Sequence, residues 1–145
     1  MPAKTYKDAD ASLLAVIKNP TESAYEVKIY APEITFEGVK AQPDYGKLFL
    51  TFYPKDSVIE LKSLKFYLQQ FRDMIISYER LANVIYEQLM QVYKPQRMRM
   101  VMTFRPRGGI SSRICIDSDW EVRGGEGKFW HHAQTEWAGK EVTLD

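Results

Sequence analysis

The amino-acid sequence predicts an α+β fold in which an antiparallel four-stranded sheet carries two helices on one face. Segments with the alternating apolar pattern of strands occur in two pairs, at residues 24–31 and 46–53 and again at 97–104 and 112–117. Between the two pairs lie two runs with the apolar spacing of helices. The predicted order is therefore strand, strand, helix, helix, strand, strand.

Composition indicates a single globular domain with a substantial core, since 45% of the 145 residues are hydrophobic and 27% are charged. A formal net charge of +1 argues against nucleic acid as a direct partner, because duplex-binding surfaces carry a clear basic excess. No run reaches the length of a membrane span, and MPAKTYKDAD lacks the apolar core of a secretory signal. The single cysteine, Cys115, excludes an internal disulfide framework. We therefore expect a cytoplasmic protein with no membrane contact.

The first part of the chain is a polar arm that we expect to dock on the body or on a neighbouring subunit. The strand at 24–31 follows, and residues 32–46, with two prolines and two glycines, are predicted to be a loop. The strand at 46–53 is partly apolar on both faces. This predicts that one face packs on helices and the other lies against another subunit.

The first helical run follows Pro54 and ends near residue 79. Ser57 stands three residues before Glu60, which allows a capping box, and the alternative is a strand that continues to about Glu60. The apolar residues of this run are Leu64, Leu68, Phe71 and Ile75. Those of the second run, which stops at Pro95, are Leu81, Val84, Ile85, Leu89 and Val92.

Lys62 and Lys65 lie in the first turns of the first helix, where the helix dipole does not favour cations. An anion is one explanation, because backbone N–H groups at a helix start and two ammonium groups together form a phosphate site. On spacing alone, a solvated helical face explains these lysines better.

The last two strands enclose a turn at residues 105–109. The first of them places Met98, Met100, Met102 and Phe104 on one face, and the second turns Ile114 and Ile116 inward. A row of methionines can form a soft-metal or cofactor surface, but a flexible apolar core is the favoured interpretation. The remaining tail is glycine-interrupted and aromatic, and we interpret it as an extension that covers or bridges neighbours.

Several short motifs together resemble the 7-cyano-7-deazaguanine reductases (QueF), the tunnel-fold enzymes of queuosine biosynthesis, a tRNA modification. They are ELKSLKFYL at residues 60–68, FR at 71–72, Glu79, QPD at 42–44 and PRGGI at 106–110. The resemblance covers roughly residues 19–112 and is specific as a set. It implies a tunnel fold in which several subunits form a barrel, with sites between adjacent chains. We accordingly divide the chain into an N-terminal arm (1–23), a tunnel-fold domain (24–120) and a C-terminal extension (121–145).

The resemblance also implies roles for individual residues. Glu79 would grip the N–H edge of a purine-like ring, and Asp44 would be the proton donor. Lys62, Lys65 and Arg107 would hold the phosphates of NADPH. Simpler explanations exist for the acidic pair: a carboxylate in the first turn of a helix is favoured by the dipole, and Asp after Pro is common in turns.

The sequence departs from the family at the nucleophile. The family's cysteine, whose thiolate attacks the nitrile to form a thioimide that two hydride transfers reduce to the amine, is replaced by Glu37, and the family's histidine before the base-binding Glu is replaced by Tyr78. A carboxylate cannot supply the thioimide, so we expect little or no nitrile reduction.

Three functions are open at this point. One is a QueF-family enzyme that binds 7-cyano-7-deazaguanine and NADPH, with its reduction to 7-aminomethyl-7-deazaguanine impaired or run differently. The second is a cysteine-free enzyme of the same fold that acts on a pterin or purine by acid–base chemistry through Glu37 and Asp44. The third is a non-catalytic ring protein that keeps the base pocket. No metal site is expected, because the only histidines, His131 and His132, are adjacent and far in sequence from Cys115.

Overall fold

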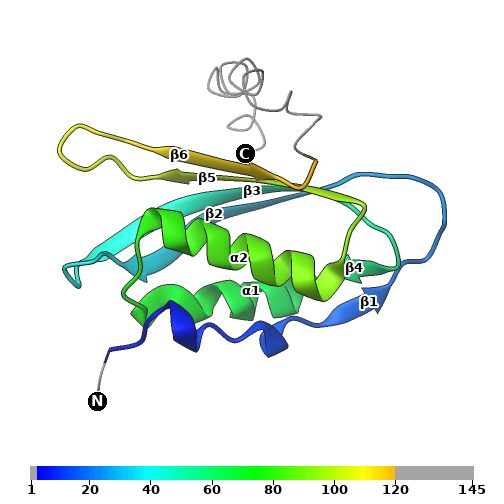
Figure 1. Ribbon diagram of the computed structural model, residues 1–145, viewed down its shortest axis with the longest axis horizontal. Coiled ribbons are helices and arrows are strands. Elements are labelled where there is room, and N and C mark those ends of the chain that lie inside the picture. Colours follow the sequence, from blue (N-terminus) through cyan, green and yellow to red (C-terminus); the bar gives the residue numbers. More distant parts are fainter. Residues whose placement is uncertain (1–2, 120–145) are drawn as a thin grey trace.

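The computed structural model describes residues 3–119 and contains the predicted sheet with both helices on the same face (Figure 1). The sheet has the order β2-β3-β5-β6, with antiparallel neighbours, and consists of β2 (Val27–Glu37), β3 (Pro43–Tyr53), β5 (Arg97–Phe104) and β6 (Arg113–Asp117). The helices are α1 (Leu61–Gln69), continued by the 3₁₀ turn η3 (Gln70–Asp73), and α2 (Tyr78–Tyr93). The predicted fold class is confirmed.

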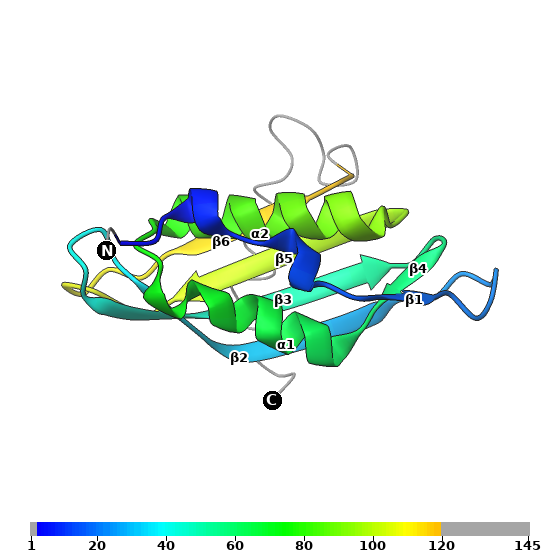
Figure 2. The ribbon, with the colours of Figure 1, turned by 90° about the horizontal axis from the view of Figure 1, so that it is seen from below.

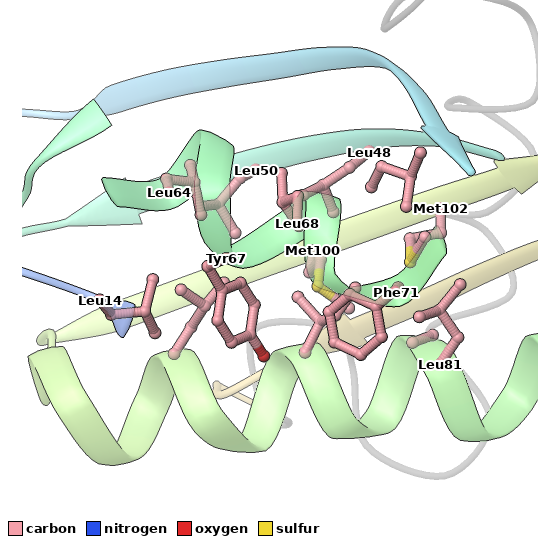
Figure 3. Packing of buried hydrophobic residues seen from close by; sticks show 14 of the residues in the cluster. Leu14, Leu48, Leu50, Leu64, Tyr67, Leu68, Phe71, Leu81, Met100 and Met102 are labelled. Carbon is pink, nitrogen blue, oxygen red and sulfur yellow. The ribbon is translucent and has the colours of Figure 1, made fainter. Parts of the chain in front are cut away.

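The core lies between the sheet and the helices (Figure 3). Alternate residues of the central strands β3 and β5 face it, as the strand pattern predicted, and all are nearly inaccessible: Leu48, Leu50, Phe52, Met98, Met100, Met102 and Phe104. From the helices, the core receives Leu64, Tyr67, Leu68, Phe71, Leu81, Ile85 and Leu89. The methionines therefore belong to the core, and their flexible side chains fill the space between the two layers.

The prediction of a loop at residues 32–46 is wrong. β2 continues to Glu37 and β3 begins at Pro43, so only five residues connect the two strands. The ladder between them shifts register between Ala31 and Ile34, at Pro32 and Glu33. Proline has no N–H for a ladder, but β2 is an edge strand and a bulge accommodates this residue. The turn residues therefore interrupt the pairing without ending the strand.

The start of α1 also differs from the capping box that the sequence allowed. Ser57 belongs to the short strand β4 (Ser57–Ile59), and Glu60 is the N-cap of α1. The Glu60 carboxylate accepts hydrogen bonds from the backbone N–H groups of Lys62, at 2.7 Å, and Ser63, at 3.0 Å. The alternative, in which the preceding strand continues to about Glu60, is also wrong: β3 ends at Tyr53, and β4 is a separate strand that pairs with β1. The first helical run ends earlier than predicted, because η3 stops at Asp73 and Ile75 lies beyond it.

The N-terminal arm crosses the helices of its own chain on the side away from the sheet (Figure 2). It contains the 3₁₀ turns η1 (Tyr6–Asp8) and η2 (Ala11–Leu13) and the strand β1 (Val16–Lys18), which pairs with β4. The hydroxyl of Tyr93 donates to the Ala15 carbonyl at 2.7 Å, and Gln88 Nε2 donates to the Ala9 carbonyl at 3.1 Å. The arm therefore docks on the body, one of the two positions expected from the sequence.

The predicted extension at 121–145, with His131 and His132, lies outside the described residues. Within residues 3–119, no helix combines the length and apolar character needed to cross a membrane.

One ion pair on the sheet face opposite the helices gives a pH-dependent prediction. The Asp117 side chain is fully buried, and its carboxylate lies 2.8 Å from Arg97 Nη2 and 3.4 Å from Arg99 Nη1. Burial opposes its ionisation, but the Arg97 hydrogen bonds, the Asp119 N–H and both arginine charges outweigh burial and lower the Asp117 pKa. A lowered folded-state pKa stabilises the fold above about pH 4, the ordinary Asp value, and this stabilisation is lost as the pH falls further.

Arg97→Gln is therefore expected to reduce the free energy of unfolding at neutral pH by about 1–3 kcal/mol, and by less near pH 3. Urea unfolding at both pH values measures the difference. Lys4→Gln is the control, because the Lys4–Asp73 pair is exposed and exposed pairs contribute little. An equal loss at both pH values would contradict the assigned role of Asp117.

Candidate functional site

Five of the seven predicted site residues gather at one end of the sheet. The β2–β3 and β5–β6 connections and the first turn of α2 all lie at this end (Figure 1). Glu37 ends β2 and Asp44 is the second residue of β3, on either side of the first connection. Arg107 lies in the β5–β6 connection, and Tyr78 and Glu79 begin α2. The fold thus brings together residues that are far apart in sequence.

Asp44 is the most enclosed of these side chains, with 3% of the residue exposed. Its Oδ2 accepts the hydroxyl of Tyr78 at 2.5 Å and lies 2.9 Å from Arg107 Nε. Its Oδ1 accepts the backbone N–H of Tyr45 at 2.8 Å. Arg107 also donates from Nη2 to the Pro43 carbonyl at 3.0 Å. Asp44 therefore links the two hairpins and α2.

Aromatic contacts fix the ring of Tyr78. It stacks on Phe104 with ring centroids 4.3 Å apart and meets the edge of Phe36 at 5.8 Å. Gly46 lies opposite Phe104 in the β3–β5 ladder, and a Cβ at Gly46 would come within 3.1 Å of the Phe104 ring. Burial raises the pKa of Tyr78, and the hydrogen bond to Asp44 and its charge raise it further. The hydroxyl is therefore protonated at neutral pH.

Glu37 is held through its backbone. Its N–H donates to the Met74 carbonyl and its carbonyl accepts the Ile76 N–H, both at 3.0 Å. In the β2–β3 ladder, Phe36 is opposite Asp44 and Glu37 is opposite Pro43. Because successive side chains along a strand point to opposite faces, the side chains of Glu37 and Asp44 leave the backbone on opposite faces of the hairpin. The register of this chain therefore does not by itself form the carboxylate pair considered from the sequence.

Glu79 is an exposed residue in the first turn of α2, one position after Tyr78. Ser77 caps this helix by accepting the N–H of Arg80 at 3.2 Å. A carboxylate at this position is favoured by the helix dipole. Because it is also exposed beside the Asp44 cluster, it remains accessible to a ligand that has paired donors.

Lys62 and Lys65 lie away from this cluster. Both are exposed on α1, which begins beside β4, at the end of the sheet opposite the two hairpins (Figure 1). The helix start cannot bind an anion through the Lys62 and Ser63 N–H groups as arranged, because Glu60 accepts both. The ammonium groups alone are thus the basis for a phosphate site there.

A groove of about 380 Å³ separates α1 from the edge strand β2. Leu64, Lys65, Leu68 and Arg72 line its helical side, and the bulge residue Glu33 lines the opposite side. Sequence reasoning did not select Arg72 as a site residue. Its spacing was a usable signal, because a residue seven positions after Lys65 returns to the same side of a helix. The groove thus has an apolar floor and two cations, which fits part of a nucleotide.

The three cations expected to hold NADPH are not brought together within one chain. Lys62 and Lys65 lie on α1, whereas Arg107 lies on the β5–β6 hairpin and pairs with Asp44. The α1 residues fit a phosphate-bearing cofactor, while Arg107 is engaged elsewhere. A site using all three would need a second copy of the chain.

Comparison with known proteins relates the chain to one family. The family model described as "QueF-like protein" matches residues 43–123, more than half of the chain. The NADPH-dependent 7-cyano-7-deazaguanine reductase of Nitratiruptor sp. is 37% identical over 107 residues, which cover 73% of this chain and 82% of that enzyme. The enzyme of the same name from Wolinella succinogenes is 34% identical over 113 residues, covering 77% and 91%.

A solved structure supports the fold. The apo crystal structure of the archaeosine synthase QueF-Like matches with a TM-score of 0.57 at 15% identity, over 68% of this chain and 95% of that chain. At this identity the likeness concerns the fold alone. Together with the strand order and the one-sided helices, it supports the architecture described above.

Proposed function

We propose that this chain, which belongs to the QueF-like family, binds a 7-deazaguanine or similar purine-like base at the end of the sheet that carries Glu79 and Asp44. The main observation in support of this proposal is that the Glu79 carboxylate is exposed beside the Asp44–Tyr78–Arg107 cluster. One carboxylate accepts two parallel hydrogen bonds from an amidine-type edge, such as that of guanine. Glu79 would thus select the ring, and the aromatic contacts of Tyr78 would keep this end of the sheet rigid.

NADPH is the proposed cofactor, since the curated relatives are named NADPH-dependent reductases. When bound, it would supply hydride. Lys62 and Lys65 would hold its phosphates, and Arg72 would assist Lys65 from the groove beside β2. These residues bind and orient the cofactor and take no part in proton transfer.

For the reaction itself, we propose that nitrile reduction is lost or very weak. Glu37 has no sulfur, and Cys115 is on β6, which lies at the far edge of the sheet from β2. The enclosed Asp44 carboxylate favours a second candidate function, acid–base chemistry on a bound purine or pterin in which Asp44 accepts a ligand N–H, with Glu37 as its partner only if a ligand or a second copy bridges the two faces of the hairpin. A non-catalytic ring protein would bind the base without converting it.

Calorimetric titration with 7-cyano-7-deazaguanine, guanine and xanthine tests base binding. Guanine and the nitrile share the donor edge that Glu79 requires, and xanthine replaces the exocyclic amino group with a carbonyl. We expect binding of the first two and little binding of xanthine. Equal affinity for all three would contradict recognition by Glu79.

We also propose a closed ring of subunits with shared sites. β2 and β6 are both sheet edges, and the three predicted cofactor cations lie on separated elements. Joining edges between copies would satisfy their backbone groups. Light scattering at micromolar concentration is expected to show a multi-subunit assembly, and a monomer would contradict this proposal.

A further inference from the structure

The surroundings of Asp44 consist of hydrogen-bond donors. Its three bonded neighbours are the Tyr78 hydroxyl, Arg107 Nε–H and the Tyr45 N–H. An ionised carboxylate only accepts hydrogen bonds, whereas a neutral carboxylic acid must also place its own proton on an acceptor. Of the three neighbours, the Tyr78 hydroxyl alone can accept, and its own proton would then need a new acceptor. The arrangement therefore matches the ionised form of Asp44.

The two side-chain donors to Asp44, Tyr78 and Arg107, are themselves held in place. The Tyr78 ring is stacked on Phe104, and Arg107 is tied to the Pro43 carbonyl through Nη2. The backbone of Arg107 is closed in a turn with Ile110, with bonds of 2.8 and 3.0 Å. Gly108 and Gly109 allow this turn, since their φ angles of 58° and 81° lie in the left-handed region. Asp44 thus meets donors whose positions are set independently of any ligand.

We propose that Asp44 acts in this chain as a fixed hydrogen-bond acceptor in its carboxylate form, and that Tyr78 and Arg107 are positioning residues that hold it in that role. The proposal rests on the proposed base-binding function for its ligand, which would offer Asp44 an N–H group. It changes the role that the sequence resemblance implied, which was proton donation.

This role bears on nitrile reduction in a way that is independent of the missing cysteine. Conversion of a nitrile to an amine adds two hydrides to carbon and two protons to nitrogen. NADPH, when bound, would supply the hydrides, and the protons would have to come from an acid at the site or from water. A carboxylate that its donors hold ionised at Asp44 supplies neither proton. Restoring a thiol at position 37 would therefore restore attack on the nitrile without restoring efficient reduction.

Asp44→Asn separates the two roles, because Asn resembles the neutral acid in having one donor group and one acceptor. If Asp44 is a fixed acceptor, the new NH₂ group faces another donor, and we expect Tm to fall by about 4–10 °C. Asp73→Asn, at an exposed residue paired with Lys4, is the matched control and should leave Tm nearly unchanged. An unchanged Tm in Asp44→Asn would overturn the proposal.

A second measurement, of the pKa of the Tyr78 hydroxyl, separates the charge of Asp44 from a loss of packing, which would not by itself produce the shifts described here. The Tyr78 Cζ resonance, identified by its absence in Tyr78→Phe, reports the pKa of the hydroxyl by NMR. Asp44→Asn removes a charge that raises this pKa and should lower it, whereas Arg107→Gln removes a charge that lowers it and should raise it. Arg107→Lys should restore most of the wild-type value. Shifts in the same direction for Asp44→Asn and Arg107→Gln would overturn the proposal. Neither measurement contains a ligand, so failure of base binding would be seen separately in calorimetry.

Discussion

The Glu37→Cys variant is expected to form a covalent adduct with 7-cyano-7-deazaguanine, whereas the wild-type chain forms none. The thiolate of the new cysteine would attack the nitrile carbon to form a C–S bond, and the nitrile nitrogen would take a proton from water, in place of the one that the thiol released. Glu37 cannot do this, because a carboxylate is a weak nucleophile towards nitriles. Its backbone is fixed by bonds to Met74 and Ile76, so a cysteine there would occupy a defined position. Intact-mass spectrometry after incubation with the nitrile measures the adduct.

The native thiol must be removed from this comparison. Cys115 on β6 is partly accessible, and Cys115→Ser in both backgrounds assigns any adduct to position 37. NADPH consumption should stay near the background rate in the wild type and rise only modestly in Glu37→Cys. A nitrile-sized mass increase in the wild type with robust turnover would show that the interpretation of Glu37 is wrong.

Glu79→Gln is expected to weaken binding of guanine-like ligands by about 2–4 kcal/mol, or roughly 30- to 1,000-fold in Kd. The change converts one acceptor oxygen into an NH₂ group and removes the charge, so one ligand N–H then faces another donor. The size of the effect requires that the ligand covers the Glu79 carboxylate, which is exposed in the single chain. Calorimetry with 7-cyano-7-deazaguanine measures it.

Glu87→Gln provides a matched control, because Glu87 is an exposed carboxylate on the same helix, two turns further on. It should bind the ligand like the wild type. The helix-start position alone gives Glu79 a stabilising interaction with the dipole, worth only a few tenths of a kcal/mol when exposed. A large loss of affinity with little change in Tm would therefore assign Glu79 to the ligand. Unchanged affinity would remove Glu79 from the site.

The local pattern of the sequence determined the fold class and the faces of most elements. Apolar residues with a period of two placed Leu48, Leu50 and Phe52 on the core face of β3, and those at helical spacing placed Leu81, Ile85 and Leu89 on that of α2. Backbone geometry alone sets the direction in which each side chain of a helix or strand points. The buried face can therefore be predicted from the spacing of apolar residues without knowing the rest of the chain. The motif set likewise identified the family, which the comparisons confirmed.

Tertiary structure decided what depends on neighbours distant in sequence. Pro32 reads as a loop residue, yet it lies within β2 because that strand is at a sheet edge and can carry a bulge. The sequence motif predicts that Arg107 binds phosphate. In the structure the two hairpins lie side by side, so that Arg107 and the Tyr78 hydroxyl both contact the Asp44 carboxylate. A sequence motif specifies which charges are present. Which charges meet is set by strand register and chain crossing, because an ion pair forms only between side chains that the packed layers bring within a few ångströms.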